Sequence, residues 1–175
     1  AMGEQSLREF IRDLYAAAYG KQALIIDVRF NGGGRTADYL LSILHVPRHA
    51  YTIGRGGKPG YPHDRLPLPE WTKPIAVLCN EASFSNAEIF AHAIKTLKRG
   101  PLIGMPTAGG VISTGQRVLM DGSRVSTPGR GWFTLDKGIN LEGNGAQPDY
   151  RVEDMPDDLA AGRDRQLDKA IEVLL

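Results

Sequence analysis

The sequence has little cysteine, no excess charge of either sign and no long apolar run, and each absence excludes a class of protein. One cysteine, Cys79, among 175 residues excludes an internal disulfide and a metal site built from cysteines. The 21 Lys and Arg nearly balance the 20 Asp and Glu, so nothing indicates a nucleic-acid partner or an anionic membrane surface. No stretch approaches the roughly 20 continuous apolar residues that span a bilayer. We expect neither a nucleic-acid nor a membrane partner.

Length and composition predict a single domain. The chain is the size of one ordinary domain, and its 42% apolar residues are enough for one packed core. Ala1 and Met2 read like the remainder of a tag and are followed at once by an amphipathic pattern. We therefore expect residues 1–175 to be one domain taken from a longer protein.

The first part of the chain predicts a helix, a strand, a glycine-rich loop and a second helix. Apolar residues at helical spacing predict a helix over about residues 4–18. Residues 23–28 (ALIIDV) form a nearly continuous apolar run, which is typical of a parallel strand buried on both faces. After the loop at 31–34, helical spacing returns from Ala37 and ends before Pro47.

The remainder of the chain repeats the alternation of strands and helices. Residues 54–73 are rich in glycine and proline and predict a long surface segment. A second buried strand is predicted at 74–79, where Cys79 would be a small buried residue, and a helix is predicted after Phe84. Further strands are predicted at 101–104, 116–120, 123–127 and 131–135, and a last helix near 167–174. The pattern predicts an α/β layered domain.

Ser85 stands where the second buried strand turns into a helix. Backbone N–H groups at a helix N-terminus lack intrahelical acceptors and carry partial positive charge. An oxyanion formed beside Ser85 would be stabilised there, with the N–H of Asn86 as a donor. However, Ser85 and Glu88 also match a capping box that merely satisfies amide groups, and from this segment alone capping is the favoured interpretation.

Two further segments could contribute to a site. The glycines at 32–34 allow close approach of a ligand to the backbone, but their spacing matches no nucleotide-binding loop, so a tight turn is the simpler interpretation. Glu142 lies among small turn residues, where a carboxylate is usually solvated but could orient a catalytic base. We expect no metal and no cofactor.

Four segments in a fixed order carry a resemblance that none of them carries alone. They are residues 24–34 (LIIDVRFNGGG), 80–90 (NEASFSNAEIF), 102–111 (LIGMPTAGGV) and 142–149 (EGNGAQPD). Together they cover nearly the whole chain and resemble the tricorn-type serine peptidases, which belong with the C-terminal processing peptidases. The resemblance implies a crotonase-like fold, with a layered β-sheet and helices in a single domain, and a peptidase that acts through an acyl-enzyme.

The resemblance also implies roles for individual residues. Ser85 corresponds to the nucleophile, and Ser83 is the less favoured neighbour. Asn86 and a glycine of the first loop, either Gly32 or Gly33, would donate N–H groups to the oxyanion. Glu142 corresponds to the glutamate that orients the base.

The base is where this sequence departs from the family pattern. Residues 108–111 read Ala-Gly-Gly-Val, so the serine–lysine dyad of some processing peptidases is disfavoured. The tricorn branch uses a histidine, which the resemblance places upstream of a segment like residues 2–10. We expect the base to lie outside residues 1–175, with little activity from this piece alone. The chain's own histidines are expected to be structural or exposed: His45, His49, His63 and His92.

Two other functions remain open at this point. The same scaffold could serve as a non-catalytic module that binds an apolar ligand or a peptide in an apolar pocket, or as an assembly segment of a larger machine. The family implies a peptide substrate, contact with the rest of the parent chain, and a homo-oligomeric assembly in the cytoplasm. Arg55, Asp64 and Trp71 in the long surface segment are candidates for substrate preference.

Overall fold

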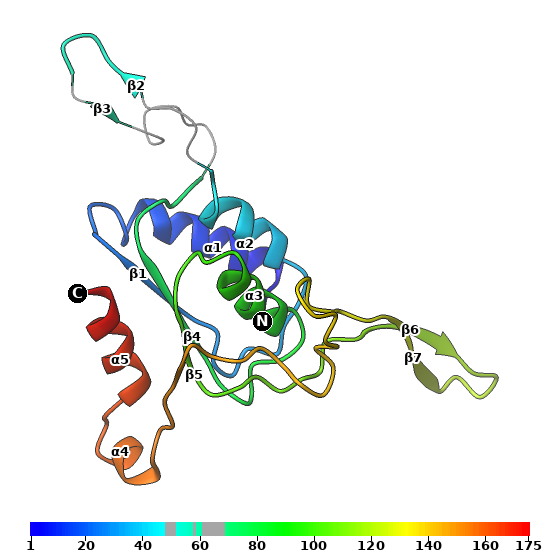
Figure 1. The fold of residues 1–175 in the computed structure, drawn as a ribbon. Helices are drawn as coiled ribbons and strands as arrows, with labels where there is room; N and C mark the ends of the chain where they lie inside the picture. Colours follow the sequence, from blue (N-terminus) through cyan, green and yellow to red (C-terminus); the bar gives the residue numbers. More distant parts are fainter. Residues whose placement is uncertain (48–51, 58, 61–68) are drawn as a thin grey trace.

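A four-stranded parallel sheet organises the computed structural model, which describes residues 1–47, 52–57, 59–60 and 69–175 (Figure 1). The strand order is β1-β4-β5-β8, and every neighbouring pair is parallel. Because all four strands run the same way, the loops that follow them meet at one edge of the sheet. The strands are β1 (Leu24–Asp27), β4 (Ile75–Cys79), β5 (Leu102–Gly104) and β8 (Tyr150–Arg151).

Helices cover both faces of this sheet. On one face lie α1 (Glu4–Tyr15), α2 (Ala37–Leu44) and α3 (Asn86–Thr96). On the other face α5 (Arg165–Leu174) packs against β4 and β5, after the short α4 (Pro156–Ala160). The described part of the chain is therefore a mixed α/β domain with a helix layer on each side of a parallel sheet.

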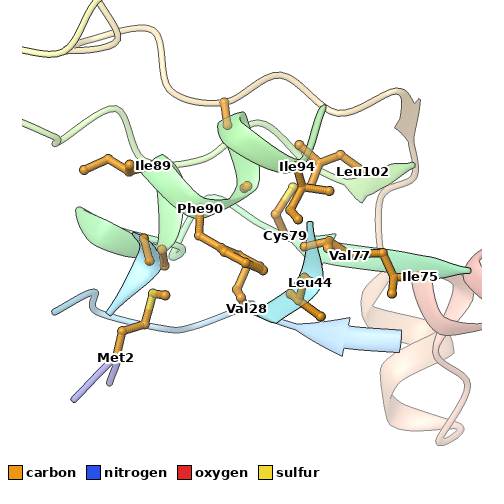
Figure 2. Packing of buried hydrophobic residues seen from close by; sticks show 14 of the residues in the cluster. Met2, Val28, Leu44, Ile75, Val77, Cys79, Ile89, Phe90, Ile94 and Leu102 are labelled. Atoms are coloured by element: carbon orange, nitrogen blue, oxygen red, sulfur yellow. The ribbon is translucent and has the colours of Figure 1, made fainter. Parts of the chain in front are cut away.

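Strand β4 divides the core between these two layers. Its residues are all buried, and alternate side chains point to opposite faces, as the pleat requires. Ile75, Val77 and Cys79 join the larger cluster around Phe90 of α3, whereas the even-numbered residues of β4 pack towards Ala170 of α5 (Figure 2). Burial raises the pKa of the Cys79 thiol to about 12, so this group is a neutral core residue at physiological pH.

Two antiparallel hairpins extend away from the sheet (Figure 1). The smaller pairs β2 (Thr52–Ile53) with β3 (Pro59–Gly60). The larger pairs β6 (Ser113–Val118) with β7 (Arg124–Arg130), and nearly all of its residues are exposed. The described surface segment is thus partly regular, in contrast to the irregular one that its composition predicts.

Most predicted elements are confirmed, with four corrections. The first helix ends at Tyr15, three residues early. Strand β1 is half-buried, because it is an edge strand of the described sheet. Residues 131–135 form no strand, only a single bridge between Phe133 and Asn140. Trp71 is buried in the core and donates to the carbonyl of Pro74, so it is no exposed specificity residue.

Four short elements escape prediction, because β2, β3, β8 and α4 are too brief to show periodicity. No helix in the described ranges is long and apolar enough to cross a membrane. Arg55 lies exposed at the tip of the β2–β3 hairpin, whereas Asp64 falls outside the described residues.

A largely buried arginine side chain joins the end of β1 to the start of α5. The Arg29 side chain is only 13% exposed and makes paired hydrogen bonds to Asp27 and to Asp164, the shortest at 2.7 Å each. Asp164 is also the N-cap of α5 and accepts from the N–H of Leu167 at 2.8 Å. Hydrogen bonding from Arg29 lowers the pKa of Asp164. Because the Arg29 guanidinium makes paired bonds to a carboxylate on β1 and to one at the start of α5, it fixes α5 against the sheet.

We predict that Arg29→Met destabilises the protein by about 2 kcal/mol, because it removes the charged hydrogen bonds that join Asp27 and the partly buried Asp164. The pairing with Asp164 stabilises the fold above the ordinary carboxyl pKa and is lost as the pH falls through the lowered one. The wild type should therefore lose stability below about pH 4, and the variant should lose less. Denaturant unfolding across pH measures both effects. Arg12→Met, which removes an exposed pair with Asp13, is the control and should change little.

Candidate active site

Ser85 lies at the carboxyl edge of the sheet, at the N-cap of α3. Its backbone has φ 56° and ψ −120°, a conformation that costs a non-glycine residue free energy. Ser85 and Glu88 are arranged as a capping box, in which Glu88 Oε1 accepts from the Ser85 N–H at 2.9 Å. The half-buried Ser85 is therefore held at the start of α3 by the bond from its backbone N–H to Glu88.

The glycine loop after β1 packs directly against Ser85. Gly33 has φ +85°, and a Cβ built on it would lie 2.7 Å from the Cβ of Ser85 and 2.8 Å from the nitrogen of Asn86. Asn31 connects the two segments, since its carbonyl accepts from the N–H of Phe84 at 2.9 Å and its side chain accepts from Gly33 at 3.0 Å. The close approach requires glycine at position 33.

Two helix N-termini meet at this point. The side-chain oxygen of Asn86 accepts from the N–H of Ala37 at 2.9 Å, which brings the first residue of α2 beside the first residue of α3. The N–H groups of Asn86 and Gly32 donate to no acceptor among the described residues. Free N–H groups with aligned helix dipoles favour an anion at this position.

Glu88 is a buried carboxylate that organises the site. It is 1% exposed and accepts four hydrogen bonds. Besides the Ser85 N–H, it accepts hydrogen bonds from the N–H groups of Gly110 at 2.9 Å and Gly109 at 2.5 Å, and from the hydroxyl of Thr107 at 2.6 Å. The loop after β5 is thereby fixed to the helix that carries Ser85. From the sequence, Glu88 was identifiable only as a capping residue, because its other donors lie some twenty residues away.

Glu142 holds the next two residues of that same loop. Its Oε2 accepts from the N–H of Val111 at 2.8 Å and of Ile112 at 2.9 Å. The N–H groups of residues 109–112 therefore donate to one carboxylate on α3 and to another in the 141–145 turn. Ser85 and Glu142 belong to one continuous hydrogen-bonded site, although 57 positions separate them in the sequence.

The described histidines lie away from Ser85. His92 is seven residues further along α3, or roughly 10 Å at the helical rise, and hydrogen bonds to Thr96 at 3.2 Å. Burial lowers its pKa. His45 is exposed at the far end of α2, about 12 Å along that helix from Ala37. His49 and His63 lie outside the described residues. Within the described ranges no imidazole reaches Ser85.

Two other potential nucleophiles are engaged in the core. Ser83 is fully buried, donates to the carbonyl of Val28 at 2.8 Å and accepts from the N–H of Asn80 at 3.1 Å. Cys79 is likewise buried and protonated. Ser85 is thus the hydroxyl of this segment that a substrate can approach.

Comparisons with known proteins agree on one family. Residues 1–152 match the family described as peptidase family S41. The tricorn protease homolog of Saccharolobus solfataricus is 37% identical over 174 residues, covering 98% of this chain and 16% of that protein. The tricorn protease of Thermoplasma acidophilum is 36% identical, covering 99% of this chain and 16% of its own length.

A solved structure supports the same relation. The crystal structure of the tricorn protease superposes with a TM-score of 0.75 at 36% identity, over 87% of this chain and 15% of that one. The chain thus spans about one sixth of the length of these three proteins.

We predict that Gly33→Ala disrupts this site, whereas Gly32→Ala leaves the fold intact. A methyl group at position 33 would collide with Phe84, Ser85 and Asn86 at a positive φ, which should destabilise the protein by about 2–4 kcal/mol. Position 32 has open space around it, so its change should stay within roughly 0.5 kcal/mol. Thermal unfolding of the two variants measures the difference, and equal Tm values would contradict the close approach.

Proposed function

The chain belongs to peptidase family S41, and on that basis we propose that it is the nucleophile-bearing core of a tricorn-type serine peptidase that hydrolyses peptides. One observation carries the proposal: Ser85 occupies a strained N-cap beside Gly33, and the N–H of the next residue, Asn86, donates to no acceptor among the described residues. Strain of this kind is retained where surrounding structure holds a functional group in position.

The proposed chemistry is acyl transfer through Ser85. Its Oγ attacks the scissile carbonyl carbon, and its proton passes to a base. The carbonyl oxygen becomes an oxyanion that accepts from the N–H of Asn86. Because the Gly33 N–H already donates to Asn31, we assign the second donor to Gly32 and the necessary space to Gly33. The amine then leaves with a proton, and water hydrolyses the acyl-enzyme to return the serine.

We propose that the base is a histidine from outside residues 1–175, oriented by Glu142. The support is that no imidazole of the described ranges reaches Ser85, while Glu142 binds the loop after β5, which Glu88 joins to the helix that carries Ser85. A carboxylate so placed can accept from one imidazole nitrogen and stabilise its charged form. Residues 108–111 contain no lysine to take this role.

The proposal extends to the fold and to the protein's surroundings. We infer a crotonase-like arrangement of the layered sheet and helices, and a domain that works as part of a longer chain. The support is the tricorn protease structure, of which this chain covers 15%. A peptide substrate, the remainder of the parent chain, homo-oligomeric assembly and a cytoplasmic location complete the proposal.

A fluorophosphonate probe tests the nucleophile. In the full-length natural protein the probe should label Ser85, and Ser85→Ala should abolish labelling and lower peptide hydrolysis roughly 10³-fold or more. Ser42→Ala removes a hydroxyl on α2 that donates to the carbonyl of Tyr39, and serves as the control. Labelling that persists in Ser85→Ala would refute the assignment. Peptide binding without any labelling or hydrolysis would favour a non-catalytic binding module.

The base makes a separate prediction about pH. A histidine must be neutral to accept the serine proton, so hydrolysis should rise as the pH increases through about 6.5 and then level off. The pH dependence of kcat/KM with a short peptide measures this. A rate that keeps rising above pH 9 would exclude a histidine base.

A further inference from the structure

One buried hydroxyl stands between the nucleophile's helix and the turn that bears Glu142. Thr107 follows β5 and is 6% exposed. Its Oγ1 donates to Glu88 Oε2 at 2.6 Å and accepts from the N–H of Ala146 at 2.7 Å. Both bonds are short and buried, so the hydroxyl is a direct link between α3 and residues 141–146.

On the first side of this link lies the nucleophile. The carboxylate that Thr107 contacts also accepts from the N–H of Ser85, three residues earlier on the same helix. A change in the position of Glu88 would therefore move the backbone of Ser85.

On the second side lies the turn with Glu142. The Thr107 N–H donates to the carbonyl of Ala146 at 3.1 Å, so Thr107 and Ala146 are paired in both directions. A Cβ on Gly145 would lie 2.8 Å from the Thr107 hydroxyl, which shows how closely the turn is packed against it. The N–H of Gly143 donates to the carbonyl of Gly109 at 2.8 Å and completes the contact.

The direction of the hydroxyl proton is determined by its neighbours. An ionised carboxylate only accepts, and a backbone N–H only donates. The hydroxyl must therefore point its proton at Glu88 and its lone pair at Ala146. Serine or threonine can satisfy both groups at this position. Valine would leave the Ala146 N–H buried and unpaired and would remove one of the four donors to Glu88.

We propose that Thr107 is a positioning residue that sets the location of Glu142 relative to Ser85 during catalysis. The proposal rests on the proposed peptidase function, in which Glu142 orients the base. Thr107 contacts neither substrate nor base. It acts by holding the nucleophile's helix and the Glu142 turn at one spacing, where displacements of about 1 Å can reduce rates on the order of 100-fold.

The test compares Thr107→Val with Thr107→Ser in the full-length natural protein. Valine keeps the volume and removes the hydroxyl, so kcat should fall by roughly 10-fold to 100-fold with KM nearly unchanged. Serine keeps the hydroxyl and should restore most of the rate. Loss of Glu142 orientation should also lower the apparent pKa of the base in the pH profile of Thr107→Val alone, because a nearby anion raises the pKa of an imidazole.

A matched control is Thr134→Val. The hydroxyl of Thr134 also accepts a backbone N–H, that of Ile139 at 3.1 Å, but has no bond to the site. Its kcat and pH profile should stay at the wild-type values. If Thr107→Val does not fold, Thr107→Ala, which leaves room for a water molecule, takes its place.

The outcomes separate this inference from the function it rests on. Absence of Ser85 labelling in the wild type overturns both. Normal labelling with an unchanged kcat and pH profile in Thr107→Val overturns the positioning role alone. Equal losses in Thr107→Val and Thr107→Ser, or a loss in Thr134→Val, would also overturn it. Faster amide exchange at Ala146 and Gly109 in Thr107→Val, with rescue by serine, supports it independently of activity.

Discussion

The site depends on one buried carboxylate having enough donors. A charged Glu88 in the interior would be strongly destabilising without compensation, because burial removes its hydration. Here three backbone N–H groups and one hydroxyl replace the lost water. Those donors come from α3 and from the loop after β5. The need to satisfy this buried carboxylate therefore determines how α3, which carries Ser85, meets the loop after β5.

The same arrangement explains how Ser85 can keep an unfavourable backbone. Its positive φ would relax if the helix start were free to move. The Glu88 bond to its N–H, the contact with Gly33 and the Asn86 bond to α2 restrain it from three sides. These independent contacts hold the half-buried serine at the carboxyl edge of the sheet. Binding sites of open α/β sheets lie at that edge.

Sequence patterns predicted what depends on short-range periodicity. The run at 74–79 and the spacing after Ala37 and Phe84 defined β4, α2 and α3 closely, because burial and helical repeat leave a local record. Ser85 and Glu142 were named from the family resemblance, and the structure brings them into one hydrogen-bonded site. The roles of Glu88 and Thr107 could not be predicted, since each depends on partners 19 or more positions away. Trp71 was misplaced because glycine and proline around it outweighed its own tendency to be buried.

The β6–β7 hairpin begins one residue after the loop that Glu142 holds. Its tip, which includes the fully exposed Met120, extends far from the sheet (Figure 1). A fluorophore attached at Met120 would leave the core and Ser85 untouched, yet remain connected to residues 109–112 through two short strands. The fluorescence of a label at the hairpin tip could therefore report the approach of a peptide or another protein in solution.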